Sequence, residues 1–479
     1  MWQGRPGRPG RRGPPHDPPR CRDRRRDRGL SEEQAVERAL ARATGGGAHS
    51  ADAVAIVAEA TEVRVRGEEI EHVKQSRERT LGLRVLVGGK GGLGQAITST
   101  SDLSDEAVDR MASEAVALAR ATAPDPDAGL PEGGFAEDLP DLELVVAEDR
   151  RAGLDRHVEA ARRAERAARA LDPRIVNSEG SDAGSQFRAV HYANSAGFEG
   201  RYESASHSLA CSPIASAEGS MQTDFWYSVS RSLAGLDEPE AVGRQAAERA
   251  LRQLGARRIA TGEFPVVFDG PTARSLLASV AGCLSGYAIY RKSSFLAGEL
   301  GERIASDRVT VIDDGRRPAG LGSRPFDGEG QPTRRTTVIE AGVLGSYLLD
   351  SYSGRKLGLG STGNASRSAG SAPGVGATNL WMEPGQGSLD ELVADMGKGL
   401  LVTGMFGHGF NPVTGDFSRG AKGFWIEGGE RCFPVEEITI AGNLRTMLSD
   451  VDAVGEELLW LGSVAAPPLR VARMTVAGE

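Results

Sequence analysis

Residues 403–443, TGMFGHGFNPVTGDFSRGAKGFWIEGGERCFPVEEITIAGN, combine strand-forming runs with closely spaced turn residues. Thr414-Gly415-Asp416 and Arg419-Gly420-Ala421 have the composition of turns, because glycine supplies a positive φ and aspartate bonds its own backbone. The aromatic and β-branched run 423–427 precedes Gly428-Gly429, and this order predicts a hairpin. The stretch therefore indicates a β-rich domain, although an ordinary hairpin meander would also account for its glycines.

Three further blocks precede this stretch in the chain and are considered together with it. Residues 285–301 read SGYAIYRKSSFLAGELG, residues 324–334 read RPFDGEGQPTR, and residues 356–365 read KLGLGSTGNA. In this order, the blocks resemble the signatures of the TldD/PmbA family, on its PmbA (TldE) side. The resemblance covers about residues 30–479 and is most specific from 264 onward. It implies a family that pairs a zinc-dependent peptidase subunit, TldD, with a PmbA/TldE subunit that lacks the metal site.

Composition and length indicate a soluble globular protein with more than one core. The chain has 479 residues, of which 26% are charged and 39% apolar. No apolar run reaches the ~18–20 residues that a membrane span needs. The four cysteines are scattered without a CxxC pair, so the sequence predicts neither a disulfide framework nor a thiolate metal site. We therefore expect a cytoplasmic protein.

Residues 1–29 differ in composition from the rest of the chain. Ten arginines against three aspartates give this segment a charge of +7. Because the whole chain has a net charge of −9, the remaining residues carry −16. A segment with almost no apolar residues cannot offset its ordering entropy, so a disordered basic tail is predicted. A basic tail can contact nucleic acid, but an acidic body repels a phosphate backbone, which makes nucleic acid an unfavoured partner.

The N-terminal region, residues 30–260, is predicted to be α+β, with a helix–four strands–helix unit that occurs twice, at 30–122 and 148–256. Ser31-Glu32-Glu33-Gln34 has the spacing of a capping box and opens the first helix. The four strand-like runs of the first unit are Ala53–Ala60, Thr61–Val73, Thr80–Val87 and Leu93–Thr100. Those of the second unit are Arg174–Ser178, Gln186–Asn194, Phe198–Ala210 and Met221–Arg231.

Residues 261–479 are predicted to form a Gly-rich, mainly β C-terminal domain. A strand at 265–268 comes first, and Pro271 stands where the next helix begins, which is expected to run to about Tyr290. The long Gly- and β-rich remainder reaches the C-terminus.

Nucleotide binding and serine hydrolysis find no support in the motifs. Residues 89–94, GKGGLG, satisfy GxGxxG, but strand-like sequence lies on both sides, so a hairpin loop is the better interpretation. No GxxxxGK[ST] loop and no GxSxG elbow is present. Asp313, Asp314, Asp327 and Glu329 are interpreted as turn and loop carboxylates, solvated or paired with Arg334 and Arg335.

Metal binding is disfavoured by the histidine spacing. None of the seven histidines falls at i,i+3 or i,i+4 from another, so no helical turn presents two imidazoles to one zinc. The resemblance implies that active subunits carry an HExxxH helix and a cysteine near the C-terminus. The matching segments here are 278–288 and 457–463, which contain no histidine, and the second contains no cysteine. Cys283 could replace a ligand, but a lone cysteine on an apolar helix face is more often a core residue. Cys432 is expected on a strand face.

Ten residues are expected to line a peptide cleft or a partner interface. Aromatic side chains on a Gly-rich loop tend to become anchors, and the turn after the 271–290 helix follows the position where the active subunit would hold its metal. For His408, a structural or partner-contact role is favoured over catalysis. The ten are Tyr290, Arg291, Ser293, Ser294, Phe295, Phe406, His408, Phe410, Asn411 and Asp416.

The resemblance implies a PmbA/TldE-like subunit of a TldD/TldE-type zinc metalloprotease complex, acting in proteolysis of peptides or unfolded small proteins. This chain would have no cofactor or zinc site of its own, and zinc is expected in a TldD-type partner. The assembly would be a heterodimer or a homodimer, and peptides would be the substrates. Two alternatives stay open: an active metallopeptidase or hydrolase with an unrecognised site, and a nucleic-acid- or gyrase-associated binding protein.

Overall fold

A large curved sheet dominates the N-terminal half of the computed structural model, which describes residues 29–478. The predicted disordered tail lies outside these residues, apart from Gly29. The strand order is β3-β2-β1-β4-β5-β6, with β7 also paired to β5. The strands are β1 (Ser50–Arg66), β2 (Glu69–Gly89), β3 (Gly92–Thr100), β4 (Ile175–Asn194), β5 (Glu199–Ala217), β6 (Ser220–Thr223) and β7 (Trp226–Ser230).

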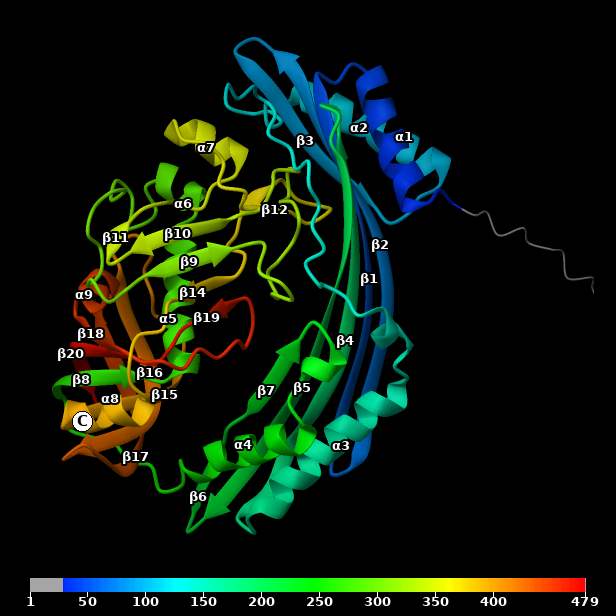
Figure 1. Cartoon of the computed structure of the whole chain (residues 1–479). Helices are drawn as coiled ribbons and strands as arrows, with labels where there is room; N and C mark the ends of the chain where they lie inside the picture. Colours follow the sequence, from blue (N-terminus) through cyan, green and yellow to red (C-terminus); the bar gives the residue numbers. More distant parts are fainter. Residues whose placement is uncertain (1–28, 479) are drawn as a thin grey trace, which may run out of the picture.

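Two pairs of helices cover one face of this sheet. α1 (Glu32–Gly45) and α2 (Asp105–Ala121) pack on β1–β3, while α3 (Leu154–Leu171) and α4 (Pro239–Leu251) pack on β4 and β5. The predicted capping box of α1 is confirmed, since the Ser31 side chain accepts from Gln34 N–H and the Gln34 side chain accepts from Ser31 N–H. In Figure 1 the sheet stands between α1–α3 and the C-terminal half.

The predicted duplication is visible in the sheet. Each unit supplies one half, and the first strands of the two units, β1 and β4, pair antiparallel at the centre. The count of four strands is wrong for the first unit, which has three. The run Thr61–Val73 spans a two-residue turn at Gly67-Glu68, where both residues have positive φ (61° and 66°). Such a turn connects two long strands directly, so the runs Ala53–Ala60 and Thr80–Val87 are parts of longer strands.

In the second unit the number of strands is as predicted, but their limits differ. The runs Arg174–Ser178 and Gln186–Asn194 are one strand, β4, because the intervening residues keep their pairing with β5 through two register shifts. The run Met221–Arg231 divides into β6 and β7, which both pair with β5. The loop interpretation of residues 89–94 is confirmed, since the turn between β2 and β3 lies there.

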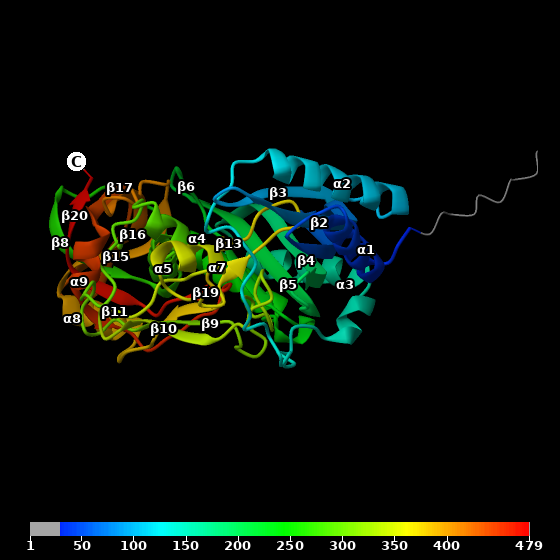
Figure 2. The same ribbon diagram turned by 90° about the horizontal axis from the view of Figure 1, so that it is seen from above.

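The C-terminal half encloses the helix α5 (Gly270–Cys283) between two sheets (Figures 1 and 2). One sheet has the order β11-β10-β9-β14-β19 and the other β17-β16-β15-β8-β20-β18. The α+β class with a mainly β C-terminal region is thereby confirmed. The strands are β8 (Gly262–Phe268), β9 (Val311–Asp314), β10 (Arg335–Glu340), β11 (Val343–Leu344), β14 (Leu380–Met382), β15 (Lys398–Phe406), β16 (Asp416–Glu427), β17 (Glu430–Asn443), β18 (Val451–Val454), β19 (Val464–Ala465) and β20 (Leu469–Ala477).

The single helix predicted from Pro271 to Tyr290 is two helices, α5 and α6 (Gly286–Tyr290). The interruption has a local cause. Leu348 N–H donates to Leu284 O and Gly286 N–H donates to Leu348 O, so the backbone between the helices bonds to a neighbouring segment instead of continuing the helical ladder. The remaining helices of this half are α7 (Ser351–Leu357), α8 (Leu389–Met396) and α9 (Leu444–Ser449).

The stretch 403–443 forms the end of β15, then β16 and β17. The hairpin at Gly428-Gly429 is confirmed. The turn predicted at Arg419-Gly420-Ala421 is wrong, because these residues lie inside β16 and pair with β15 and β17 on either side. Gly420 therefore lies in a central strand with a neighbouring strand on each side. Composition alone does not distinguish a glycine in such a strand from a glycine in a turn.

The two halves pack against each other through the open face of the large sheet. Alternate residues of β1 face opposite sides: Ala53 and Ala55 pack on α1 and α2, while Val54 packs with Phe326 and Ala369 of the C-terminal half. Ala369 lies between the short strands β12 (Ala365–Ser366) and β13 (Gly374–Val375). Its carbonyl oxygen would lie 1.7 Å from a Cβ at Gly82, so only glycine permits this contact. Within residues 29–478, no helix is long and apolar enough to cross a membrane.

Candidate functional site

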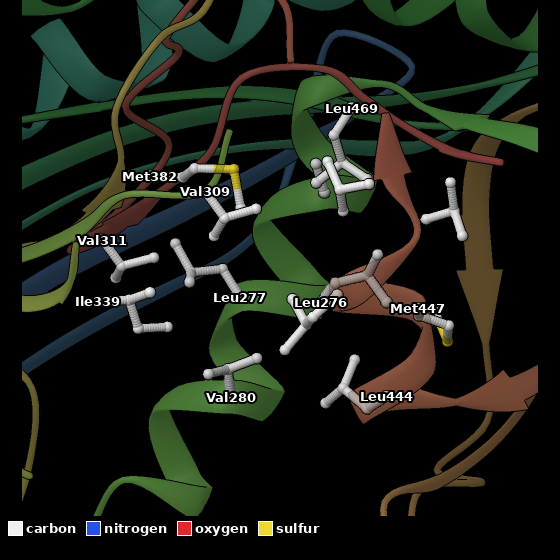
Figure 3. Close-up of a pocket in the computed structure, with 14 residues that line it drawn as sticks. Leu276, Leu277, Val280, Val309, Val311, Ile339, Met382, Leu444, Met447 and Leu469 are labelled. Atoms are coloured by element: carbon white, nitrogen blue, oxygen red, sulfur yellow. The ribbon is translucent and has the colours of Figure 1, made fainter. Parts of the chain in front are cut away.

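The inner face of α5, the helix that contains the first part of the segment 278–288 expected to match the HExxxH helix, is entirely apolar (Figure 3). Asp269 caps its first turn by accepting from Thr272 N–H. Burial raises the pKa of the Cys283 thiol to about 11, and the residue lies in the main core, so its interpretation as a core residue is confirmed. A cavity of about 20 Å³ beside the helix is lined by, among others, Leu276, Leu277, Val280, Val309, Val311, Ile339, Met382, Leu444, Met447 and Leu469.

The outer face of α5, which we define by Arg274, Ser275, Ala278 and Gly282, carries small side chains and one cation. Ala278 and Gly282 are exposed, and no atom lies within 4 Å of a Cβ placed on Gly282. A zinc site needs imidazole, thiolate or carboxylate ligands, and this face offers none. In the part of the chain that the structure describes, no three His, Cys, Asp or Glu side chains are grouped to hold a metal. The residues present on α5 therefore do not fit zinc.

Aromatic rings and cations border this outer face. Arg274 donates to the Tyr227 hydroxyl at 2.9 Å, and the Tyr227 ring stacks on Phe225, whose side chain is 55% exposed. Lys422 pairs with Asp224 at 3.0 Å, and its ammonium lies 5.7 Å from the Phe406 ring. Phe225 follows Asp224 in the chain and Phe406 contacts Lys422, so the Asp224–Lys422 pair connects two exposed rings from opposite halves of the chain.

The end of α6 and the turn after it contain five of the predicted residues, and two of them are structural. Ser294 is buried and donates to Cys283 O at 2.7 Å, and Phe295 is buried in the core. Ser293 donates to Ala288 O at 3.2 Å. Tyr290 and Arg291 differ, because both line a cleft of about 330 Å³.

Three tyrosine rings form one wall of this cleft. Tyr287, Tyr290 and Tyr352 lie with ring centroids 5.6–6.0 Å apart. The Arg291 guanidinium lies 5.5 Å from the Tyr287 ring and 5.4 Å from the Tyr290 ring. Such cation–aromatic contacts hold the exposed guanidinium at the mouth of the cleft. The cleft lies between the halves, since the first half also lines it with Arg84, Leu93, Gln95, Thr122, Ala123, Asp125, Ala128 and Gly129.

Two hydroxyl–carboxylate bonds orient the tyrosines. Tyr352 donates to Asp125 at 2.7 Å, and Tyr287 donates to Asp350 at 3.2 Å. Burial, followed by the Asp125 hydrogen bond, raises the pKa of Tyr352 to about 12. The hydroxyls are therefore protonated donors at neutral pH. Neither Tyr352 nor Asp350 was among the predicted site residues; the capping pattern of 350–353 could have located α7 but not its position in the cleft.

A buried charge cluster lies behind the cleft. Arg84 donates through Nε to Asp52 at 2.7 Å, and Arg367 pairs with the other oxygen of that carboxylate. Burial tends to raise the pKa of Asp52, but the Arg367 and Arg84 guanidiniums outweigh it and hold the pKa below its ordinary value. Glu329 Oε1 lies 3.6 Å from Arg84 Nη2 and accepts from the Ser351 hydroxyl at 2.7 Å.

The interpretation of Asp313, Asp327 and Glu329 as solvated turn carboxylates is wrong, because all three are buried. Asp313 accepts from Asn364 and from Thr378 N–H, both at 2.7 Å. Asp327 accepts from three backbone N–H groups. The proposed arginine partners lie elsewhere, since Arg334 donates to the carbonyls of Ser361 and Thr362 and Arg335 pairs with Glu383. Glycine-rich loops that pack under a sheet have the same composition as exposed ones.

Asp327 and Glu329 are expected to make stability depend on pH. Burial, and next the neighbouring Glu329, raise the pKa of Asp327 to about 7, and burial likewise raises that of Glu329. The unfolded chain releases this proton near pH ~4, so between roughly pH 4 and 7 the folded state holds the extra proton. The free energy of unfolding contributed by the pair should therefore fall as the pH rises through this window.

Urea unfolding of the wild type and of Glu329→Gln, at pH 5, 6, 7 and 8, measures this effect. The variant removes the like charge beside Asp327, so its free energy of unfolding should fall less between pH 5 and 7 than that of the wild type. Parallel pH profiles for the two proteins would contradict the prediction.

The loop 406–416 contains the other five predicted residues. The Phe406 side chain is 54% exposed, and His408 and Asn411 are exposed as well, whereas Phe410 packs against the main core. Phe295 N–H donates to Pro412 O at 2.8 Å, so the two predicted segments do meet at this point. The interpretation that Asp416 bonds its own backbone is wrong: its carboxylate accepts from the Thr414 hydroxyl and from Asn443 Nδ2, at 2.6 and 3.2 Å.

Comparison with known proteins identifies the family. Models of the PmbA/TldA metallopeptidase match in three parts: domain 1 at residues 51–119, the central domain at 148–254 and the C-terminal domain at 261–478. Metalloprotease PmbA of Escherichia coli O157:H7 is 38% identical over 449 residues, which cover 92% of this chain and 96% of that protein. The chain belongs to the PmbA/TldD metallopeptidase family.

Solved structures agree with this assignment. A crystal structure from Bacteroides thetaiotaomicron, described as a candidate modulator of DNA gyrase, is 30% identical, with a TM-score of 0.85 over 93% of this chain and 99% of that one. TldE from Thermococcus kodakarensis is 24% identical, with a TM-score of 0.82 over 93% of this chain and 100% of that one. The second likeness shows a shared fold.

Proposed function

We propose that this chain is the PmbA/TldE-type subunit of a TldD/TldE-type zinc metallopeptidase complex in the cytoplasm, and that it has no zinc site of its own. The observation that carries the proposal is the outer face of α5. Where a metallopeptidase would present two imidazoles and a general base, this helix presents Ser275, Ala278 and Gly282. The zinc and the base would then come from a TldD-type partner.

In this proposal the chain contributes surface rather than chemistry. Phe225 and Phe406 offer exposed aromatic rings, and Arg274 and Arg419 place positive charge at the outer face of α5, since Arg274 belongs to this face and Arg419 donates to the Ser275 hydroxyl at 3.1 Å. An unfolded peptide exposes apolar side chains, backbone carbonyls and carboxylates, which aromatic rings and cations bind. The proposed substrates are peptides or unfolded small proteins, held for cleavage at the partner's zinc.

Zinc content and assembly test the proposal together. After gel filtration, the pure chain should contain far less than one zinc per chain, and Cys283→Ala should leave this value unchanged because the thiol is buried in the core. Cleavage of an unstructured peptide should require the TldD-type subunit from the same host and should stop on addition of a chelator. About one zinc per chain, or cleavage by this chain alone in the presence of a chelator, would overturn the proposal.

A further inference from the structure

A buried row of polar side chains joins α3 to the sheet, far from α5. His157 of α3 lies with Nε2 2.7 Å from the Ser185 hydroxyl of β4, and the same hydroxyl lies 2.6 Å from His207 Nδ1 of β5. Ser185 and His207 are directly opposite in the β4–β5 ladder, so their side chains share the face that α3 covers. Phe187 closes the row with its ring edge-on to His207, at 5.6 Å.

Each end of the row faces an oxygen that brings no proton. His157 Nδ1 lies 3.3 Å from Gly153 O, and His207 Nε2 lies 3.5 Å from Asp149 Oδ2. Asp149 belongs to the 3₁₀ helix η1 (Ala147–Arg151) and also accepts from Leu233 N–H at 2.8 Å.

The protons available do not suffice for the row. Four contacts in sequence need four protons, whereas two neutral imidazoles and one hydroxyl carry three. The inner contacts, at 2.6 and 2.7 Å, are too short for a nitrogen and an oxygen without a proton between them, so each has one. The third proton lies in one of the two outer contacts, His157 Nδ1–Gly153 O at 3.3 Å or His207 Nε2–Asp149 Oδ2 at 3.5 Å, and the other outer contact has none.

The geometry also indicates which contact lacks its proton. His207 Nε2 is buried and has no hydrogen-bond partner, whereas His157 Nδ1 is within bonding distance of Gly153 O. The neutral row is therefore His157 Nδ1–H donating to Gly153 O, the Ser185 hydroxyl donating to His157 Nε2, and His207 Nδ1–H donating to Ser185. His207 Nε2 is left bare in front of the Asp149 carboxylate.

We propose that His207 Nε2 is a site that takes up a single proton from solvent as the pH falls. The protonated Nε2 then donates to the Asp149 carboxylate, and this ion pair stabilises the contact of η1 with β5. The proton completes the row without moving any other: Nε2 becomes a donor, His207 becomes an imidazolium, and its charge is balanced by Asp149. Because Leu233 N–H donates to Asp149, the same ion pair also stabilises the segment before α4.

The charged surroundings set where this uptake occurs. Burial lowers the pKa of His207, Asp149 opposes this, and His157 and Arg156 of α3 add to the lowering. Burial also lowers the pKa of His157. From η1, Arg150 lies over the Phe187 ring, and β7 places the uncharged Ser230 opposite His207. Uptake is therefore expected below the ordinary histidine range near pH ~6.5.

Nitrogen-15 NMR of the histidine rings in the full chain tests the proposal between pH 8 and 5. At pH 8, both His157 and His207 should carry their proton on Nδ1. On acidification, the His207 ring should take up one proton and become an imidazolium, while the His157 ring stays neutral. His191 of β4, which bonds to Glu199 of β5, lies outside the row. The variant His191→Gln identifies the His191 signals by their loss, and it should leave the tautomers and the titration of His157 and His207 unchanged.

Two variants separate a proton site from mere packing. Ser185→Ala removes the acceptor of His207 Nδ1–H, so the His207 proton should move to Nε2, where Asp149 accepts it. Asp149→Asn should leave the tautomer of His207 unchanged and lower the pH at which the ring titrates. Amide exchange of residues 147–151 should slow below the midpoint in the wild type, relative to Asp149→Asn.

A wild-type His207 with its proton on Nε2 at pH 8, or two rings that titrate independently, would overturn the proposal. So would labelling of Ser185 by a fluorophosphonate, since that result would define a nucleophile instead of a proton site. Because the first measurement uses the wild-type chain, it stands even where a variant fails to fold.

Discussion

Replacing Asp52 with asparagine is expected to lower the free energy of unfolding by about 3–5 kcal/mol, because it leaves two buried guanidiniums without their common counter-ion. Asp52 is fully buried, and the side chains of Arg84 and Arg367 are 4% and 2% exposed. Glu329, 3.6 Å from Arg84, then remains as the nearest carboxylate. Equilibrium unfolding in urea at pH 7.5 measures the change.

The consequence should extend beyond stability. Arg367 follows β12 in the segment that packs on β2, so Asp52 holds part of the C-terminal half against the sheet. In Asp52→Asn, proteases should cut residues 366–374 faster than in the wild type, because the segment loses its charged attachment.

Asp182→Asn is the matched control. Arg64 and Asp182 form a pair on the same sheet with a similar two-bond geometry, but their side chains are 40% and 32% exposed. An exposed pair contributes ~1 kcal/mol or less, so this variant should unfold close to the wild type. Equal losses in Asp52→Asn and Asp182→Asn would show that burial of the charge cluster has no special effect, and the prediction would be wrong.

Truncating Phe406 to alanine should weaken the complex with the TldD-type subunit, or its uptake of peptide, about 30-fold while the fold survives. The loss corresponds to the ~2 kcal/mol that an aromatic anchor typically contributes. The Phe406 ring is 54% exposed and lies over Lys422, so its removal leaves no cavity in the core. Gel filtration of mixtures and cleavage of an unstructured peptide measure the two effects, and thermal unfolding checks the fold.

Leu118→Ala is the control for Phe406→Ala. Leu118 is also 54% exposed, but it lies on α2, on the face of the large sheet away from the C-terminal half. Its truncation should change neither binding nor cleavage. Phe410→Ala is a less specific test, because Phe410 packs against the core and its loss should also lower Tm. Wild-type binding and cleavage by Phe406→Ala would remove the loop from the proposed interface.

Signals that act over a few residues were sufficient for several predictions. The capping box at Ser31, the hairpin at Gly428-Gly429 and the loop between β2 and β3 each depend on neighbours within about four positions. The same holds for the start of α5 at Pro271, although the end of this helix was predicted at Tyr290 and lies at Cys283. The family followed from ordered blocks of such local patterns.

Errors arose where a local pattern has two tertiary outcomes. Gly420 reads as a turn residue, yet it lies in a strand bordered on both sides. Asp327 and Glu329 read as loop carboxylates, yet the loop lies beneath the large sheet, where Arg84 and backbone N–H groups satisfy them. Whether a polar loop residue is solvated depends on what packs over it, and that partner is distant in sequence.

The sequence by itself determined the family, through the resemblance of its ordered blocks. It also determined the α+β class and the duplicated N-terminal unit, because these depend on residue types and short spacings. Only the tertiary structure decided which distant groups meet. It brought Tyr352 to Asp125 across 227 positions and Arg367 to Asp52 across 315. It also placed His207 opposite Ser185 and under α3. Strand register and packing between the halves set these contacts, and no spacing along the chain encodes them.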